Sequence, residues 1–166
     1  MSVTVVVGNP KRQSRTLAAA QLLAESVADR SADLVVDLAD LGAELLDWSS
    51  PTVAGTVAEV QDSSLVVFAS PTYKGSYTGL LKLFLDRFGR GSLNGLYAAV
   101  PLMLGGDPRH ALAPEVFLKP VLVEIGASCP TAGLFLLESE WDQPSSLGGW
   151  LERWKPLLAP ATVAAG

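Results

Sequence analysis

The segment from Gly8 to Thr16 has the residue types of an anion-binding loop. Three of its residues are cations, namely Lys11, Arg12 and Arg15. No Asp or Glu occurs in residues 1–24, and Ser14 and Thr16 add hydroxyl groups just before an Ala- and Leu-rich stretch with helical spacing. A helix N-terminus offers unpaired amides and the positive end of the helix dipole, so phosphates bind there. We therefore expect Ser14, Arg15 and Thr16 to bind a phosphate; the alternative is that Ser14 only caps the helix and the cations are solvated.

The segment from residue 71 to residue 76 has the residue types of a contact for a flat ring. Pro71 stiffens the backbone, Tyr73 offers an aromatic ring with a hydroxyl group, and Gly75 lets the main chain approach a planar ligand closely. Residues 64–84 contain no acid, so this region is locally basic. The ring-contacting candidates are consecutive: Pro71, Thr72, Tyr73, Lys74, Gly75 and Ser76.

A third segment, Gly105-Gly106-Asp107, follows another apolar run. Its glycine pair would let a further stretch of backbone approach the same planar ligand. Segments that follow neighbouring parallel strands meet at one edge of a sheet, where ligands of such folds bind. One segment suited to phosphate and two suited to a ring indicate a mononucleotide with a large aromatic head, and FMN fits that description.

Two standard nucleotide fingerprints are absent, and so is a metal-binding pattern. Gly8 has none of the further glycines that a P-loop or a G-x-G-x-x-G dinucleotide loop requires. Cys129 is the single cysteine and His110 the single histidine, so no cluster of soft or imidazole ligands can form. We predict no metal site and no side chain that acts as a catalytic acid or base.

The elements that must position these segments are strands and helices in strict alternation. Short apolar runs without polar alternation predict strands buried on both faces: Val3–Val7, Leu34–Leu38, Leu65–Ser70, Leu96–Leu104 and Gly133–Leu137. Apolar residues at spacings of three and four predict the helices: Thr16–Ala28, Val53–Asp62, Tyr77–Phe88, Ala113–Ile125 and Leu147–Leu158. This alternation predicts an α/β fold of right-handed βαβ units. We expect a flavodoxin-like three-layer sandwich whose five-stranded parallel sheet has the order 2-1-3-4-5.

Length and composition limit the remaining possibilities. The chain has 166 residues, 49% of them apolar and 17% charged, with a formal net charge of −5. We expect one domain over residues 1–158 and a frayed Ala-rich tail over residues 159–166. An acidic balance argues against a nucleic-acid partner, and no apolar run approaches the ~20 residues of a membrane span. We expect a cytoplasmic protein with no membrane contact.

The three segments together resemble the NADPH-dependent FMN reductases. The strongest likeness is to the flavin reductases that supply two-component sulfonate monooxygenases, which have a P-x-Y-K-[AG]-[AS]-Y-[ST]-G-x-L-K motif. This chain has the whole motif from Pro71 to Lys82. The likeness runs in order from Val3 to about Leu137.

The resemblance implies an activity and a set of contacts. Hydride would pass from NADPH or NADH to FMN, and the cofactor rather than a side chain would provide the reactive groups. Residues 14–16 would hold the FMN phosphate, and residues 71–76 would line the ribityl chain and the ring. Gly105, Gly106 and Asp107 would lie along the opposite edge. The resemblance also implies a homodimer or homotetramer formed through the Tyr77–Phe88 helix, and a partner monooxygenase that uses the reduced flavin.

One stretch departs from the pattern of the sulfonate-linked reductases. Their fourth helix has a D-Y-A-L-K-P-like stretch whose aromatic residue perturbs the helix and accompanies loose flavin binding. Here residues 115–120 read Glu-Val-Phe-Leu-Lys-Pro, so the tyrosine is absent although Phe117 is adjacent. The sequence therefore leaves open whether FMN is a prosthetic group or a diffusible substrate.

Three other functions compete with a flavin reductase. The same fold could be a quinone or azo-compound reductase with tightly bound FMN. It could also be a flavodoxin-type electron carrier, although the cations of the first loop count against this because such carriers are more acidic. A binding module without flavin is the fourth reading.

Overall fold

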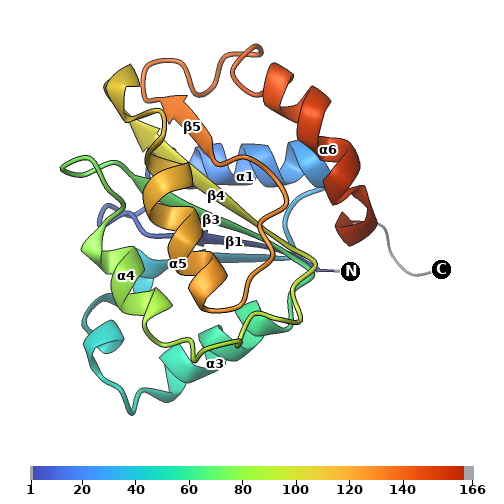
Figure 1. Cartoon of the computed structure of the whole chain (residues 1–166). Helices are drawn as coiled ribbons and strands as arrows, with labels where there is room; N and C mark the ends of the chain where they lie inside the picture. Colours follow the sequence, from blue (N-terminus) through green and yellow to red (C-terminus); the bar gives the residue numbers. More distant parts are fainter. Residues whose placement is uncertain (1, 163–166) are drawn as a thin grey trace.

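Five short apolar segments form the parallel strands of one sheet (Figure 1). The structure is a computed structural model and describes residues 2–162. The strands are β1 (Val3–Val7), β2 (Leu34–Asp37), β3 (Leu65–Pro71), β4 (Ala98–Gly105) and β5 (Leu134–Leu137). Their order is β2-β1-β3-β4-β5, and all neighbours run parallel. The predicted order 2-1-3-4-5 is confirmed.

Helices cover both faces of the sheet. The α-helices of the described residues are α1 (Arg15–Ala28), α2 (Leu38–Leu41), α3 (Pro51–Gln61), α4 (Gly79–Leu85), α5 (Lys119–Glu124) and α6 (Gly148–Thr162). Shorter elements are the 3₁₀ helices η1 (Gly42–Leu46) and η2 (Pro108–His110) and a π-helix, η3 (Pro114–Leu118). Helices α1 and α6 pack on one face, and α3, α4 and α5 pack on the other (Figure 1). The predicted three-layer sandwich is therefore present.

The apolar runs have the burial that their pattern predicts. Every residue of the three central strands β1, β3 and β4 is buried, because helices cover both sides of each of them. The outer strands β2 and β5 keep partly exposed positions. Each face of the sheet has its own apolar cluster, one under α1 and α6 and one under α3, α4 and α5.

The predicted Tyr77–Phe88 and Ala113–Ile125 helices differ from the structure in their extent. Helix α4 is shorter than the predicted Tyr77–Phe88, because Thr78 is extended and its hydroxyl accepts a hydrogen bond from the Leu81 amide as an N-cap. The predicted Ala113–Ile125 helix is divided into the π-helix η3 and the short helix α5. Apolar spacing alone does not reveal either change, since a cap and a wide turn alter the backbone without altering the spacing of the apolar residues in the sequence.

The C-terminal helix is longer than predicted. Helix α6 continues through Thr162, so the expected frayed tail over residues 159–166 is helical for its first four residues. Leu158 is the last apolar residue of the predicted pattern and is fully buried, and the predicted helix therefore ended there. Residues 163–166 lie outside the described part of the chain. In residues 2–162 no helix is both long enough and apolar enough to cross a bilayer.

Gly8 stands where the end of β1 meets helix α4. A Cβ atom at this position would lie only 2.9 Å from the Leu81 Cα, so the helix backbone packs directly against the glycine. The Gly8 amide donates to the Ala69 carbonyl at 2.8 Å, and the Gly8 carbonyl accepts from the Thr78 hydroxyl. This close approach places the loop after β1 next to the loop after β3.

Candidate functional site

A cavity of about 340 Å³ lies beyond the carboxyl ends of β1 and β3. The chain order of the sheet reverses between these two strands, and ligands of open α/β sheets bind at that point. The cavity is lined by the loop after β1, by the loop after β3 and by the ends of β4 and β5. Its residues are Asn9, Lys11, Gln13, Ser14, Arg15, Thr16, Pro71, Tyr73, Leu104 and Glu138.

Side-chain hydrogen bonds hold the loop after β1 in place. The Asn9 amide group donates to the Thr16 hydroxyl at 3.0 Å, and its oxygen accepts from the Lys11 amide at 2.9 Å. Ser14 is the N-cap of α1, and its hydroxyl accepts from the Leu17 amide at 3.2 Å. Asn9, Ser14 and Thr16 are all buried, so they anchor the loop to the rest of the fold. Ser14 does cap the helix, as the alternative held, but Arg12 and Arg15 are paired rather than only solvated, and capping leaves the other first-turn amides available.

The first turn of α1 presents unpaired donors to the cavity. Within residues 2–162, no acceptor lies within hydrogen-bonding distance of the Arg15 and Thr16 amides. Gln13, just before the helix, has a φ of 48°, a left-handed conformation that costs a non-glycine residue about 1 kcal/mol. Backbone strain of this kind persists only where the surrounding structure holds the residue in that conformation. The turn therefore has the geometry of a phosphate cradle.

Carboxylates from distant segments face the cations of this loop. Arg12 Nε lies 2.9 Å from Asp40 Oδ1, and Arg15 Nη2 lies 3.0 Å from Glu138 Oε2. Residues 1–24 contain no acid, but acids lie beside them in the fold, because Asp40 follows β2 and Glu138 follows β5. Lys11 has no ion pair within the described residues, so its charge is available at the cavity wall.

The loop after β3 forms a small hairpin. Tyr73 and Ser76 exchange backbone hydrogen bonds of 2.8 and 3.1 Å. Between them, Lys74 has a φ of 53° and Gly75 a φ of 82°, the pair of positive values that a type I′ turn requires. Pro71 and Tyr73 line the cavity, whereas Thr72, Lys74, Gly75 and Ser76 do not. Only the base of this predicted ring-contacting segment therefore faces the cavity.

Buried hydroxyl groups hold the base of this hairpin. The Ser70 hydroxyl donates to the Pro71 carbonyl at 2.8 Å and accepts from the Thr78 amide at 3.0 Å. The Thr78 hydroxyl donates to the Gly8 carbonyl, which joins the end of β3 to the end of β1. Both hydroxyl groups are buried, so the relative placement of the two loops is fixed by the core.

The segment after β4 contributes in a different way from the one predicted. A Cβ atom on Gly105 would lie 2.9 Å from the Phe135 ring, so packing within the protein, rather than a ligand, requires glycine there. At Gly106 a Cβ atom would meet nothing within 4 Å, which leaves that backbone open to a ligand. Among the described residues, the Thr72 hydroxyl is buried beside Gly105 and has no hydrogen-bond partner. A buried hydroxyl without a partner is rare and is consistent with a contact to a bound molecule.

Asp107 is bound to Arg109 two residues later. Its carboxylate accepts from the Arg109 amide at 2.8 Å and from the guanidinium Nη2 at 2.7 Å. These hydrogen bonds from Arg109 lower the pKa of Asp107 to about 2. Asp107 does not line the cavity, and its carboxylate caps the N-terminus of η2.

We expect the Asp107 carboxyl to titrate near pH 2 in the folded chain, which carbon-detected NMR would measure. Because its pKa is depressed, any contribution of this pair to stability is present above the ordinary carboxyl pKa and is lost as the pH falls toward 2. Arg109→Gln should return the midpoint toward the ordinary Asp value of about 3.9. A midpoint that the substitution does not move would contradict the assigned cause.

Comparison with known proteins agrees with this arrangement. The sequence pattern of the NADPH-dependent FMN reductases matches residues 1–142. The chain belongs to this family. Among its relatives, the FMN reductase (NADPH) of Pseudomonas aeruginosa is 34% identical over an alignment of 149 residues, with 84% of this chain and 78% of that one covered. The NADH-dependent FMN reductase SfnF of Pseudomonas putida is 32% identical over 152 residues, with 85% and 80% covered.

Solved structures show the same fold. The apo form of the NADH:FMN oxidoreductase EMOB superposes with a TM-score of 0.82 at 28% identity, covering 99% of this chain and 91% of that one. A flavodoxin from the domain Archaea, at 15% identity and a TM-score of 0.61, shares the fold. The family resemblance expected from the three loop segments is confirmed.

The chain forms a π-helix, η3, although it lacks the tyrosine of the corresponding stretch in the sulfonate-linked reductases. The Lys119 amide donates to the Pro114 carbonyl five residues back, which defines the wide turn of η3. Glu115 Oε2 accepts from the Gly133 amide at 2.6 Å, and Oε1 accepts from Lys119 Nζ at 2.8 Å. Although burial opposes it, these two donors lower the pKa of Glu115. A partly exposed ion pair and the bond to the Gly133 amide, rather than an aromatic residue alone, therefore hold this perturbed helix next to β5.

Two functional candidates escaped prediction from the sequence. Asn9 organises the loop after β1, and Glu138 lies at the cavity wall. Asn9 lies within the first loop, where its amide side chain next to Gly8 was a usable signal. Glu138 directly follows the last predicted strand, at the same carboxyl edge as the other three segments. That position was the available signal.

Proposed function

We propose that this chain is an NAD(P)H-dependent flavin reductase that transfers hydride from NADPH or NADH to FMN in the cavity at the carboxyl edge of the sheet. The observation that supports this most is the first turn of α1, where two unpaired amides and Arg15 face the switch-point cavity. Membership in the NADPH-dependent FMN reductase family supports the same activity.

The residues of the cavity fit an FMN molecule. The Ser14, Arg15 and Thr16 positions would hold the phosphate through backbone amides and the guanidinium group. Of the residues expected from the resemblance, Pro71 and Tyr73 line the cavity and would hold the ribityl chain and the ring, together with the Gly106 backbone, which is open to a ligand. Thr72, Lys74, Gly75, Ser76, Gly105 and Asp107 do not line the cavity. FMN, when bound, supplies the ring that accepts the hydride. The chain supplies orientation, and Pro71 and Leu104 present apolar surface that excludes water.

The direct test is oxidation of NADPH or NADH by the purified chain with FMN added. We expect oxidation that requires FMN and saturates with it. A quinone or azo-compound reductase needs one of those compounds as its acceptor. With free FMN alone, such an enzyme would not give continued turnover. Absence of FMN-dependent oxidation with either nucleotide would contradict the proposal. Gel filtration followed by a visible spectrum then shows whether FMN stays bound or is a diffusible substrate.

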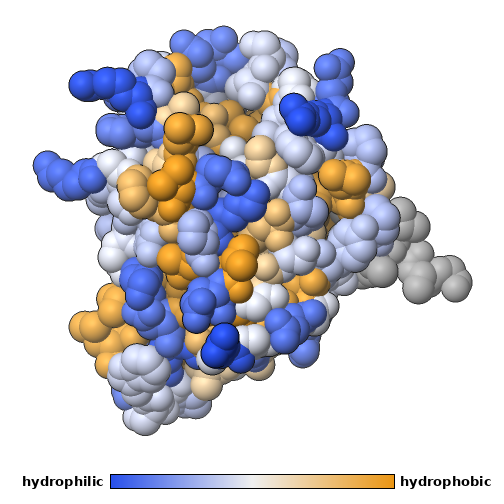
Figure 2. Space-filling view, viewed as in Figure 1, coloured by the Kyte–Doolittle hydropathy of each residue, from blue (hydrophilic) through white to orange (hydrophobic). Residues whose placement is uncertain are grey.

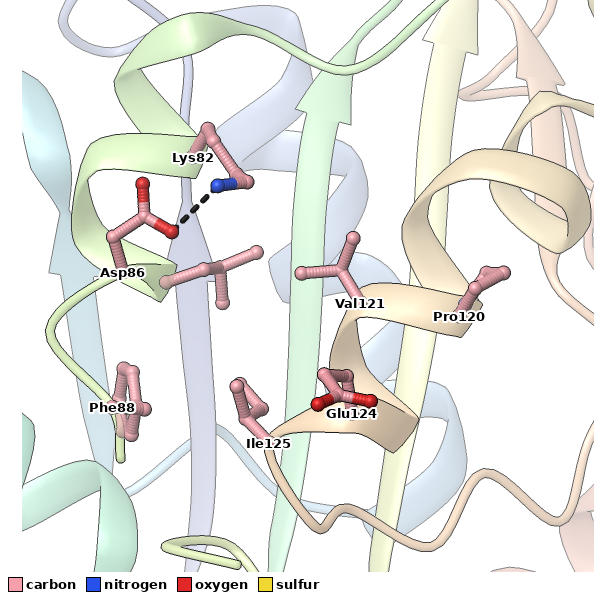
Figure 3. A pocket seen from close by; sticks show the side chains of 8 residues that line it. Lys82, Asp86, Phe88, Pro120, Val121, Glu124 and Ile125 are labelled. Carbon is pink, nitrogen blue, oxygen red and sulfur yellow. Dashed lines mark hydrogen bonds and ion pairs between the residues drawn. The ribbon is translucent and has the colours of Figure 1, made fainter. Parts of the chain in front are cut away.

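We further propose that a second copy of the chain packs on the face formed by α4 and α5. The apolar residues of α4 itself are largely buried in its own domain, with Leu81, Phe84 and Leu85 at most 1% exposed. The groove between α4 and α5 has a volume of about 350 Å³. It is lined by the apolar residues Phe88, Val121 and Ile125 and by the charged residues Lys82, Asp86 and Glu124 (Figure 3).

Exposed apolar side chains extend this groove along η3 and α5 (Figure 2). Val116 is 53% exposed, Phe117 46% and Val123 54%. Together they support association through α4 and α5 into a homodimer or homotetramer.

Val123→Glu should shift the chain toward monomers in analytical ultracentrifugation, because it places a charge in this apolar face. We expect a dissociation constant raised at least tenfold, from about 1.4 kcal/mol or more of lost association energy. Leu157→Glu on α6 is the matched control, since Leu157 is 48% exposed on the opposite layer. A monomeric wild-type chain, or equal effects of the two substitutions, would contradict this interface.

We also propose a cytoplasmic location and a partner monooxygenase that consumes the reduced flavin. The likeness to the flavin reductases of two-component sulfonate systems supports the partner. A coupled assay tests it: the chain, with NADPH and FMN, should support turnover by a flavin-dependent monooxygenase that has no reductase of its own. If the chain reduces FMN but supports none of the monooxygenases tested, the partnership is contradicted and the flavin reductase activity is not.

A further inference from the structure

Glu138 lies at a fixed position on the wall of the candidate FMN cavity. It directly follows β5, and its amide donates to the Gly105 carbonyl at 3.0 Å. Its side chain is 35% exposed. This backbone bond ties the residue to the end of β4, and its side chain reaches Arg15 at the start of α1.

The carboxylate of Glu138 occupies the guanidinium group of Arg15. Arg15 Nη2 lies 3.0 Å from Glu138 Oε2, and Nη1 donates to the Glu138 carbonyl at 3.3 Å. Both terminal nitrogens of Arg15 are therefore engaged by one residue from the far side of the sheet. Arg15 is also the first residue of α1, so its side chain starts beside the unpaired amides of the phosphate cradle.

A phosphate at this cradle would require the same donors. Guanidinium N–H groups bind carboxylates and phosphates alike, and the Glu138 carboxylate holds one of them, on Nη2, so a phosphate at Arg15 competes with it. A phosphate at the Arg15 and Thr16 amides would also meet the Glu138 carboxylate as a neighbouring like charge. We propose that Glu138 competes with the FMN phosphate for Arg15 and thereby weakens FMN binding, so that the flavin can leave. This inference rests on the proposed function.

Asp40 provides a matched control because it has the same charge and a similar contact. It pairs with Arg12 at 2.9 Å in the neighbouring part of the loop, yet neither Asp40 nor Arg12 lines the cavity. Glu138→Gln and Asp40→Asn each remove one negative charge near the loop. Only the first removes a competitor for the donors that face the cavity.

The test compares FMN with riboflavin, which has the same ring but no phosphate. Dissociation constants are measured by quenching of flavin fluorescence for the wild type, Glu138→Gln and Asp40→Asn. We expect Glu138→Gln to tighten FMN binding about three- to tenfold at low salt and to leave riboflavin within about twofold. Asp40→Asn should change neither by more than about twofold. The gain should shrink as salt rises, and the KM for FMN should fall with the dissociation constant.

Three results would overturn the inference. Glu138→Gln could tighten both flavins equally, which would assign Glu138 to the ring. It could weaken FMN binding, which would mean that Glu138 positions Arg15 for the phosphate. It could leave FMN binding unchanged. If the wild type binds neither flavin, the proposed function fails together with this inference. If the wild type binds riboflavin as tightly as FMN, flavin binding is retained and only this inference fails, because the phosphate then adds no affinity. Should Glu138→Gln fold poorly, Glu138→Ala has the same expectation, since the backbone bond to Gly105 does not involve the side chain.

Discussion

Arg15→Gln should lower the affinity for FMN by about ten- to a hundredfold, because hydrogen bonds to charged groups contribute about 1.5–3 kcal/mol each. The substitution removes the guanidinium beside the unpaired first-turn amides of α1. It also leaves Glu138 without its partner, so that a carboxylate faces the incoming phosphate. Riboflavin affinity should change less than about threefold, since the guanidinium contact is made to the phosphate. Flavin fluorescence titration measures both constants.

Arg12→Gln is the control for Arg15→Gln. Arg12 lies in the same loop and has its own carboxylate partner, Asp40, but it does not line the cavity. We expect FMN affinity within about threefold of the wild type. A double variant of Arg15 and Glu138 should recover part of the loss caused by Arg15→Gln alone, because the unpaired carboxylate is then gone. Equal losses for Arg12→Gln and Arg15→Gln would contradict the assignment of the phosphate to the α1 cradle.

Gly8→Ala should reduce the free energy of unfolding by about 3 kcal/mol, because the added methyl group overpacks the junction of β1 and α4. The methyl carbon would lie 2.9 Å from the Leu81 Cα, a backbone atom that cannot rotate away. Displacement of α4 would also strain the hydrogen bond from the Thr78 hydroxyl to the Gly8 carbonyl. For a chain of this length the melting temperature should fall by roughly 6–12 °C, which calorimetry measures.

Gly55→Ala is the matched control for Gly8→Ala. Gly55 lies inside helix α3, and a Cβ atom there meets nothing within 4 Å. Glycine in a helix interior costs about 0.5–1 kcal/mol relative to alanine, so this substitution should stabilise the chain. Destabilisation by both substitutions, or by neither, would contradict the account of Gly8 as a packing requirement.

The fold was predictable because its strands are buried on both faces. In β1 and β3 every residue is buried, and their unbroken apolar runs are the direct result of that burial. Helix boundaries were less predictable, because a cap or a π-turn changes the backbone without changing which side chains face the core. The perturbed helix η3 depends on Glu115, whose partner amide belongs to Gly133 near β5. No local pattern contains that contact.

The loops that line the candidate site could be predicted from the sequence, whereas the ion-pair partners of its charged residues could not. Ser14 and Thr16 lie in one segment with the helix that they begin, so their positions followed from local sequence. The partner of Arg15 is Glu138, which is 123 positions away and meets it only because β5 ends at the same edge of the sheet. The hairpin tip was equally hidden, since a positive φ at Lys74 is an unusual conformation for lysine.

Direct reduction of bound flavin by a nicotinamide nucleotide is the measurement that tests the central claim most directly. The chain is mixed without oxygen with FMN and then rapidly with NADPH or NADH, and the visible absorbance of the flavin is followed. A flavin reductase bleaches the flavin in a single-turnover phase whose rate saturates with the nucleotide. Flavin that binds to the chain but keeps its absorbance with both nucleotides would contradict the account and would favour an electron carrier.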